Sequence, residues 1–315
     1  MGKYTNRTGI SSCIADAIES FNEDYDSVGW QSVTSLIDSP RSKLLTQRHQ
    51  QKITEDVADL LWSFFGNMGH LIAERNASIG SMAERRFLLE HMGKQISFKP
   101  DLLERDPNEF NVFELNDFKF TSVYILKNAL KGNTKLEWVK QMNVYVWCLK
   151  QLGYEVSKIK LHIIARDWRS SEALRERDYP PSQCAVVEVE IWEDDKIKKY
   201  VEERIALYTS CEILSDDELP FCSEAERWAD PDKFAVVKTN SKVSNTTGYK
   251  KALPKASFLD RSDAQMFISN RDDADELEIE FRRGESRRCE RGYCKAAPFC
   301  NQFKDYIIGG NNVDT

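Results

Sequence analysis

Regular patterns of apolar and polar residues predict most of the secondary structure of this chain. An apolar strand interrupted by two charged residues covers residues 111–120, and a strand-like segment precedes it at residues 95–103. The turn-rich residues 104–109 between the two segments allow an antiparallel hairpin. Apolar and polar residues also alternate over residues 158–165 and 185–192, which predicts two further strands.

Helical patterns flank these strands. We expect helices over residues 43–76, 135–152 and 194–214, the first of them interrupted near its glycines, and a passage from helix into hairpin over residues 84–120. Residues 1–30 are weakly patterned and acidic, which predicts a weakly ordered, mobile arm. Together these elements favour an α/β fold, with a mixed central sheet flanked by helices.

The most informative break in the pattern is the pair Asp117 and Lys119, inside the apolar strand. Residues two apart on a strand point to the same face, so these two side chains project together. The predicted hairpin would bring Asp101 close to Asp117. Two carboxylates beside a lysine can bind a divalent cation and stabilise a phosphoryl transition state. Because an isolated D-x-K triplet is most often a surface salt bridge, the interpretation depends on neighbouring motifs.

Those motifs stand on either side in a definite order. Gly66 and His70 lie four apart in a segment of helical character, and Pro100 directly precedes Asp101. Gln141 and Tyr145 are also four apart, so on a helix they share one face.

This ordered set resembles the PD-(D/E)xK nucleases of the RecB and Cas4 type, including Cas4-like exonucleases encoded by phages. Their hallmarks are a helical G-x-x-x-H, a P-D, a D-x-K on the next strand and a Q-x-x-x-Y helix, and all four occur here. The resemblance covers roughly residues 30 to 305. One departure is Phe98, where a glycine is common in the family. The resemblance implies a restriction-endonuclease-like core with a cysteine-bound C-terminal module.

The resemblance also implies the function and its residues. It implies a Mg²⁺- or Mn²⁺-dependent DNA nuclease, of exonuclease type, acting on single-stranded or end-containing DNA in recombination, repair or phage replication. The catalytic residues would be Asp101, Asp117, Lys119, Gln141 and Tyr145. The metal ligands would be His70, Asp101, Asp117 and the backbone carbonyl of Phe118. Glu84 and Glu114 rank lower, and Glu114 lies three positions before Asp117, so it faces the opposite side of a regular strand.

The eight cysteines form two groups. Without a secretory signal they do not indicate a disulfide framework. Four stand apart in apolar or mixed contexts: Cys13, Cys148, Cys184 and Cys211. The others are one upstream residue and a compact C-terminal trio: Cys222, Cys289, Cys294 and Cys300. This second set is similar to the iron–sulfur arrangement of Cas4 and AddB-type nucleases. Four thiolates suit a [4Fe–4S] cluster or a tetrahedral Zn²⁺ ion, and the lack of C-x2-C pairs favours iron–sulfur.

The cluster is expected to be structural. The polar, turn-rich segment between Cys222 and Cys289 has few long apolar stretches, so metal–thiolate bonds would stabilise it by closing a long loop. The expected domains are an arm at 1–30, a nuclease core at 31–214, an iron–sulfur module at 215–305 and a tail at 306–315.

Charge leaves a nucleic-acid partner open. The net charge of −7 argues against a non-specific DNA coat, but binding depends on local positive patches. Arg287, Arg288 and Arg291 beside the last cysteines are DNA-binding candidates, with a merely solvated face as the alternative. If they are solvated, the DNA path is expected over the lysines between Lys127 and Lys140.

The remaining expectations concern setting and alternatives. No apolar run reaches the roughly 18 residues that span a bilayer, and the N-terminus lacks a secretory apolar stretch. We expect a cytoplasmic protein, in a bacterial host cell if phage-encoded, with DNA and a helicase or recombination protein as partners and no membrane. Two other functions stay open: a non-cleaving DNA-binding or assembly subunit on a nuclease fold, and a zinc-stabilised nucleic-acid-binding module.

Overall fold

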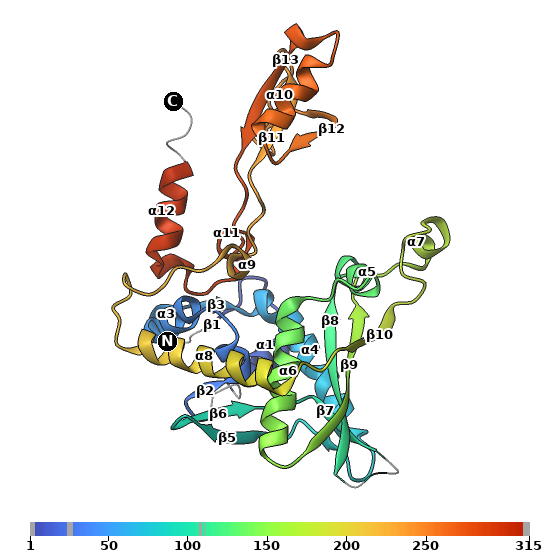
Figure 1. The fold of residues 1–315 in the computed structure, drawn as a ribbon, viewed down its shortest axis with the longest axis vertical. Helices are drawn as coiled ribbons and strands as arrows, with labels where there is room; N and C mark the ends of the chain where they lie inside the picture. The colour runs from blue at the N-terminus through green and yellow to red at the C-terminus, as the bar shows by residue number, and fades with distance from the viewer. Residues whose placement is uncertain (1–3, 24–27, 107–108, 110, 311–315) are drawn as a thin grey trace. The chain divides into compact units, whose positions relative to one another are not determined.

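The computed structural model describes residues 4–23, 28–106, 109 and 111–310 (Figure 1). The chain divides into two compact units, residues 1–40 with 50–213 and residues 41–49 with 214–315. The division after residue 213 lies one residue from the predicted boundary. The sequence did not predict that the short segment 41–49 would join the C-terminal unit. No helix in the described part of the chain is long and apolar enough to cross a membrane.

The first unit contains a mixed five-stranded sheet among its described residues, in the order β10-β9-β8-β7-β4. The strands are β4 (Met82–Ala83), β7 (Leu102–Arg105), β8 (Val112–Thr121), β9 (Glu155–Ala165) and β10 (Cys184–Val189). β8 and β9 run parallel, and the other pairs are antiparallel. The predicted mixed sheet and its hairpin are confirmed, since Leu102 of β7 lies opposite Asn116 of β8.

The segment predicted as one strand at residues 95–103 is two strands in different sheets. β6 (Lys94–Phe98) pairs with β2 (Gln31–Ser32) and β5 (Phe87–His91), whereas β7 belongs to the five-stranded sheet. Pro100 lies at the break, because proline has no backbone N–H to donate to a sheet ladder.

The helix expected at the start of residues 84–120 is also wrong. β5 and β6 form an antiparallel hairpin there. Its two-residue turn has positive φ at both positions, 51° at Met92 and 69° at Gly93, the geometry that matches the twist of paired strands. The alternation of buried Phe87 and Leu89 with exposed Leu88 is the strand pattern that the prediction overlooked.

The helices of the first unit are α1 (Ser12–Glu23), α2 (Val33–Leu36), η1 (Gln50–Lys52), α4 (Val57–Arg75), α5 (Val123–Leu130), α6 (Leu136–Gln151), α7 (Ser170–Arg175) and α8 (Asp194–Glu212), of which α2, α4, α5 and α6 contact the sheets. α6 runs alongside the parallel strands in Figure 1, and its buried Val144 and Leu149 share one core cluster with Leu115 and Ile159 of the sheet. The helix expected over residues 43–76 is instead broken between Arg48 and Val57, and α4 continues as a single helix through both of its glycines.

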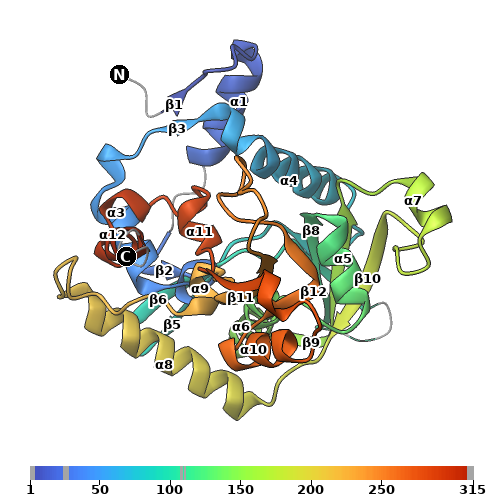
Figure 2. The same cartoon turned by 90° about the horizontal axis from the view of Figure 1, so that it is seen from above.

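The described residues of the expected N-terminal arm include a short strand and a helix. β1 (Tyr4–Thr5) pairs in parallel with β3 (Glu55–Asp56), and α1 lies beside α4 (Figure 2). Ala15 and Ile18 of α1 are buried with Val57 of α4. Although this region is acidic, its sequence contains an apolar helix face, with residues at helical spacing. Residues 1–3 and 24–27, which were part of the predicted arm, lie outside the described residues.

The second unit begins with α3 (Pro40–Arg48) and resumes after α8. Its other elements are α9 (Glu224–Arg227), β11 (Lys233–Lys238), β12 (Ala252–Phe258), α10 (Arg261–Ser269), η2 (Ala274–Glu276), β13 (Leu277–Arg282), α11 (Arg287–Glu290), η3 (Ala297–Phe299) and α12 (Asn301–Gly310). Contrary to expectation, the polar segment has a small core of its own. The antiparallel sheet β12-β11-β13 packs on α10, burying Val236, Ala256, Ala264 and Leu277. The predicted tail is helical through residue 310.

Candidate active site and cysteine centre

Asp117 and Lys119 project together from β8, as the strand periodicity predicts. Lys119 Nζ donates a hydrogen bond to Asp117 Oδ1 at 3.0 Å and lies 2.8 Å from Oδ2. Asp117 is only 1% exposed. Burial raises the pKa of Asp117 to about 6; Lys119 opposes that shift and the negative charge of Asp101 adds to it. The ammonium therefore compensates a carboxylate that is buried at considerable electrostatic cost.

Asp101 lies in the turn before β7 and is tied to the neighbouring strand. Its Oδ2 accepts a hydrogen bond of 2.7 Å from the backbone N–H of Phe118. The N–H and C=O of one strand residue face the same edge. The carbonyl of Phe118 therefore also faces the edge at which Asp101 lies, which is the position required of a backbone ligand.

His70 of α4 completes a group of ligand atoms with Asp101 and Glu84. Its Nδ1 lies 3.2 Å from Asp101 Oδ1 and 3.0 Å from Glu84 Oε1. One ligand atom from each of the three residues lies within 4.8 Å of the other two. Burial by itself lowers the pKa of His70, but hydrogen bonds and charge from Asp101 and Glu84 outweigh it and raise the pKa to about 10.

Glu84, which the sequence analysis ranked below the other candidates, belongs to this group of ligand atoms. It stands in a left-handed backbone conformation with φ at 49° and also forms an ion pair with Lys99. No periodic pattern pointed to it, since it lies between elements. Glu114, ranked beside it, instead forms ion pairs with Lys158 and Lys160, as its place on the opposite face of β8 predicts.

Gln141 and Tyr145 of α6 extend the contacts of Lys119. Gln141 Oε1 accepts a hydrogen bond from Lys119 Nζ at 3.3 Å, and Gln141 Nε2 donates to the Tyr145 hydroxyl at 3.0 Å. Phe98, where the family commonly has glycine, is 2% exposed and places its ring 5.7 Å from the ring of Tyr145. Phe98 therefore packs against Tyr145 in the core and does not line the cleft described below.

These side chains share an open cleft of about 680 Å³. Its walls carry four cations: Arg86, Lys99, Lys119 and Lys135. The predicted residues on its lining are His70, Asp101, Phe118, Lys119, Gln141 and Tyr145, together with Glu84. Asp117 lies beneath this surface. Carboxylate oxygens and an imidazole are donors that suit Mg²⁺ or Mn²⁺, so the residues fit such an ion.

The second unit gathers the four predicted cysteines. Cys222, Cys289, Cys294 and Cys300 line one small cavity. Hydrogen bonding to Cys294 and burial raise the pKa of the Cys289 thiol. Hydrogen bonds from Cys289 and Ser42 lower the pKa of Cys294 to about 6 against the effect of burial. The four remaining cysteines all belong to the first unit, Cys148 and Cys211 buried and Cys13 and Cys184 exposed.

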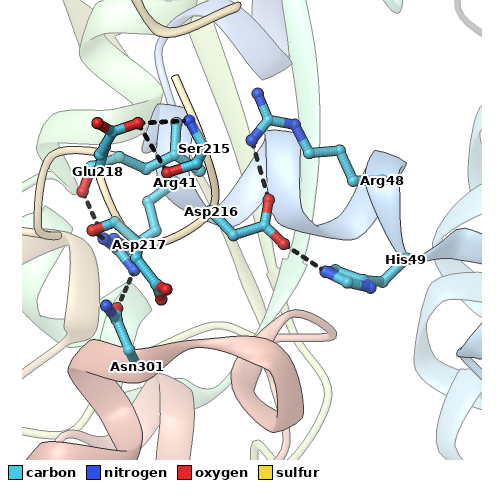
Figure 3. Close-up of polar contacts among 9 residues, drawn as sticks. Arg41, Arg48, His49, Ser215, Asp216, Asp217, Glu218 and Asn301 are labelled. Carbon is cyan, nitrogen blue, oxygen red and sulfur yellow. Dashed lines mark hydrogen bonds and ion pairs between the residues drawn. The ribbon is translucent and has the colours of Figure 1, made fainter. Parts of the chain in front are cut away.

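The wall of this cavity contains a buried arginine that the sequence analysis did not identify. Arg41 of α3 is 1% exposed and donates to Asn301 Oδ1 at 2.6 Å (Figure 3). It also donates to the Pro220 carbonyl at 3.2 Å, to Cys300 Sγ at 3.7 Å and to the Leu219 carbonyl. Four thiols beside one buried cation fit a thiolate-bound centre, because the guanidinium offsets negative charge on sulfur.

The three predicted DNA-binding arginines have contacts within the same unit. Arg287 forms an ion pair with Asp230 at 3.3 Å, and Arg291 Nε donates to Glu285 Oε1 at 2.7 Å. Arg288 donates to the Glu226 carbonyl at 3.1 Å and lies over the ring of Trp228. Their DNA role stays a prediction.

Comparisons with known proteins add little. No family model matches the chain, and no curated protein matches it. The solved structure of SSO0001 is 16% identical at a TM-score of 0.42, covering 62% of this chain and 84% of that one. An alkaline exonuclease (LHK-Exo) from Laribacter hongkongensis is 14% identical at a TM-score of 0.33, with coverage of 57% and 87%. At such TM-scores neither likeness supports a conclusion about function.

Proposed function

We propose that the protein is a Mg²⁺- or Mn²⁺-dependent deoxyribonuclease of the PD-(D/E)xK type, acting as an exonuclease on single-stranded or end-containing DNA. One observation supports this most directly. Lys119 lies between Asp117 and Gln141, on the same cleft as the oxygen ligands of Asp101 and Glu84. The family resemblance implies its setting: recombination, repair or phage replication in the cytoplasm, with a helicase or recombination protein as partner.

The proposed metal ligands are His70, Asp101, Asp117 and the Phe118 carbonyl, to which the geometry adds Glu84. A divalent ion held by these residues would lower the pKa of its bound water and offset charge on a phosphate. His70 must lose its proton to bind a metal. In the metal-free protein its raised pKa makes it a cation that separates the carboxylates of Asp101 and Glu84.

Lys119 supplies fixed positive charge at the cleft. Its ammonium, held by Asp117 and Gln141, can offset the negative charge that develops on the transferring phosphoryl group. Tyr145 acts through Gln141, since the hydroxyl accepts the hydrogen bond that orients the amide. Neither residue of α6 is required to exchange a proton in this scheme.

We also propose that Cys222, Cys289, Cys294 and Cys300 hold a [4Fe–4S] cluster, with tetrahedral Zn²⁺ as the alternative. The shared cavity and the buried Arg41 support a thiolate-bound centre. Hydrolysis of a phosphodiester needs no redox chemistry, so the proposed role is structural.

The test compares the full-length protein with single variants on end-labelled single-stranded and duplex DNA, with Mn²⁺ or Mg²⁺. We expect Asp117→Asn and Lys119→Ala to lower the cleavage rate by about 10²–10³-fold or more while DNA binding persists. Glu114→Gln is the matched control, because it changes an acid of the same strand that contacts Lys160 outside the cleft. Cleavage retained in either site variant refutes the assignment. A parent protein that binds DNA without cleaving it would instead be the non-cleaving subunit.

A further inference from the structure

Helix α4 exposes large apolar side chains beside the cleft. Trp62 is 58% exposed and Phe65 is 48% exposed. They stand three residues apart, so they share one face of the helix, and their ring centroids are 5.9 Å apart. Trp62 lines the same cleft as His70. An exposed aromatic pair of this kind indicates a binding surface more strongly than scattered single residues do.

A cation completes this surface. The guanidinium of exposed Arg166 lies over the Trp62 ring, 4.1 Å from its centroid. The backbone N–H of Arg166 donates to the Thr121 carbonyl at 2.8 Å, which fixes the arginine at the end of β8, the strand of Asp117 and Lys119. An aromatic face beside a cation suits a nucleic-acid strand, because bases stack on the ring while phosphates attract the guanidinium.

The helix surface between Trp62 and His70 is left open. A Cβ at Gly66 would meet nothing within 4 Å, and Gly66 lines the cleft. Trp62 and His70 are eight residues apart, which is about 12 Å along an α-helix. Stacked nucleotides rise about 3.4 Å each, so three or four would span this distance. The aromatic surface is therefore within reach of a strand whose phosphate lies at His70.

We propose that Trp62, flanked by Arg166, is a base-stacking platform for an unpaired nucleotide of the DNA substrate. This inference rests on the nuclease function proposed above and names its substrate class, single-stranded DNA or a frayed end. In an intact duplex the neighbouring bases cover the faces of each internal base, so the indole cannot stack there. A polyanionic strand fits better than an apolar protein partner, because Arg166 covers part of the ring and four cations line the adjoining cleft.

The test measures binding of a fluorescent 12-nucleotide single strand and of a covalently closed circular duplex, which has neither ends nor an unpaired loop, to the full-length protein, without added divalent metal. Loss of one stacked base costs about 1–3 kcal/mol. We therefore expect Trp62→Ala to weaken single-strand binding roughly 5- to 140-fold and to leave duplex binding unchanged. Trp62→Phe should restore part of the loss. Tyr124→Ala is the matched control, since Tyr124 is 67% exposed on α5 and outside the cleft lining.

Equal single-strand affinities for the parent and Trp62→Ala, or equal losses on single strand and duplex, would overturn the platform. If Trp62→Ala does not fold, abasic sites placed one at a time in the strand give a second measurement on the parent. One or two positions should then weaken binding selectively, and a uniform response contradicts the platform. A parent that cleaves no DNA in Mn²⁺ while Trp62→Ala selectively loses single-strand binding refutes the nuclease function alone.

Discussion

The carboxylate site and the cysteine centre differ in their ligand atoms, in their exposure to solvent and in the cations that lie beside them. At the first, hard oxygen ligands face an open cleft, and each buried acid has a basic neighbour: Lys119 for Asp117 and His70 for Asp101. At the second, soft thiols line a small cavity beside the fully buried Arg41. An open polar site can exchange an ion and a substrate with solvent, whereas a small cavity lined by four thiols suits a component that stays bound.

The two sites also differ in what they join. The carboxylate site is assembled on α4, β8 and α6. β8 and α6 contribute to the main apolar core, and α4 contacts β8, so these elements are held together without the site. The cysteine centre brings α3 together with residues 220–302, and the described residues between Cys222 and Cys289 bury only a small core of their own. Loss of its ligand set should therefore affect stability far more than loss of a carboxylate.

The largest expected effect follows from that difference. Cys294→Ser removes the cysteine whose pKa is lowered to about 6. We expect loss of bound iron or zinc and a thermal midpoint lower by many degrees, because a thiolate-bound structural metal contributes on the order of 10 kcal/mol to folding. Metal analysis and calorimetry measure both. Cys184→Ser, an exposed cysteine of the first unit, is the control. Equal metal loss in the two variants would contradict the assignment of ligands.

Much of this contrast was predictable from the sequence. The D-x-K spacing fixes which face of a strand two side chains share, and the C-terminal cysteines could be grouped by their short spacings. Arg41 and Glu84 could not be found this way, because they reach their sites through tertiary contacts. Arg41 lies 259 residues before Cys300, and Glu84 lies between elements. The β5–β6 hairpin was missed for a local reason: its strands are short, and the turn residue Met92 is not a typical turn former.

A second variant tests whether the buried cation belongs to the cysteine centre. Arg41→Met keeps an apolar stem of similar length but removes the donors to Leu219, Pro220 and Cys300. Leaving buried acceptors unpaired costs about 1–3 kcal/mol each. We expect a lower thermal midpoint and faster metal release to a chelator, while Arg41→Lys should be intermediate because one ammonium cannot reach all partners. If Arg41→Met releases the metal at the parental rate, Arg41 does not contribute to holding the metal at the cysteine centre.

Two glycines of α4 test how closely this helix approaches β8 at the carboxylate site. A Cβ at Gly69 would lie 2.3 Å from the ring of Phe120 on β8, whereas one at Gly66 meets nothing within 4 Å. Gly69→Ala should cost about 1–3 kcal/mol through overpacking and displace His70 from Asp101. Gly66→Ala should instead stabilise the helix by up to about 1 kcal/mol. Denaturant unfolding of both variants measures the difference. Equal effects would show that α4 does not approach β8 this closely.

The smallest expected effect concerns exposed ion pairs near Arg41. Asp216 accepts hydrogen bonds from Arg48 at 2.9 Å and His49 at 2.7 Å (Figure 3), and these partners lower the pKa of Asp216. A lowered carboxyl pKa contributes stability above the unfolded value, and this contribution is lost as the pH falls through the folded value. Because Asp216 is about one-third exposed, solvent screening limits the contribution to less than about 1 kcal/mol. Asp216→Asn should thus lower the thermal midpoint slightly at pH 7, and the difference from the parent should vanish as the pH falls below the folded-state pKa of Asp216, where the parental carboxyl is also neutral. If Asp216→Asn lowers the thermal midpoint at pH 7 as much as Arg41→Met does, the partly exposed contacts of Asp216 stabilise the protein as strongly as the buried contacts of Arg41. The ion pairs of Asp216 would then also help to hold the cysteine centre together.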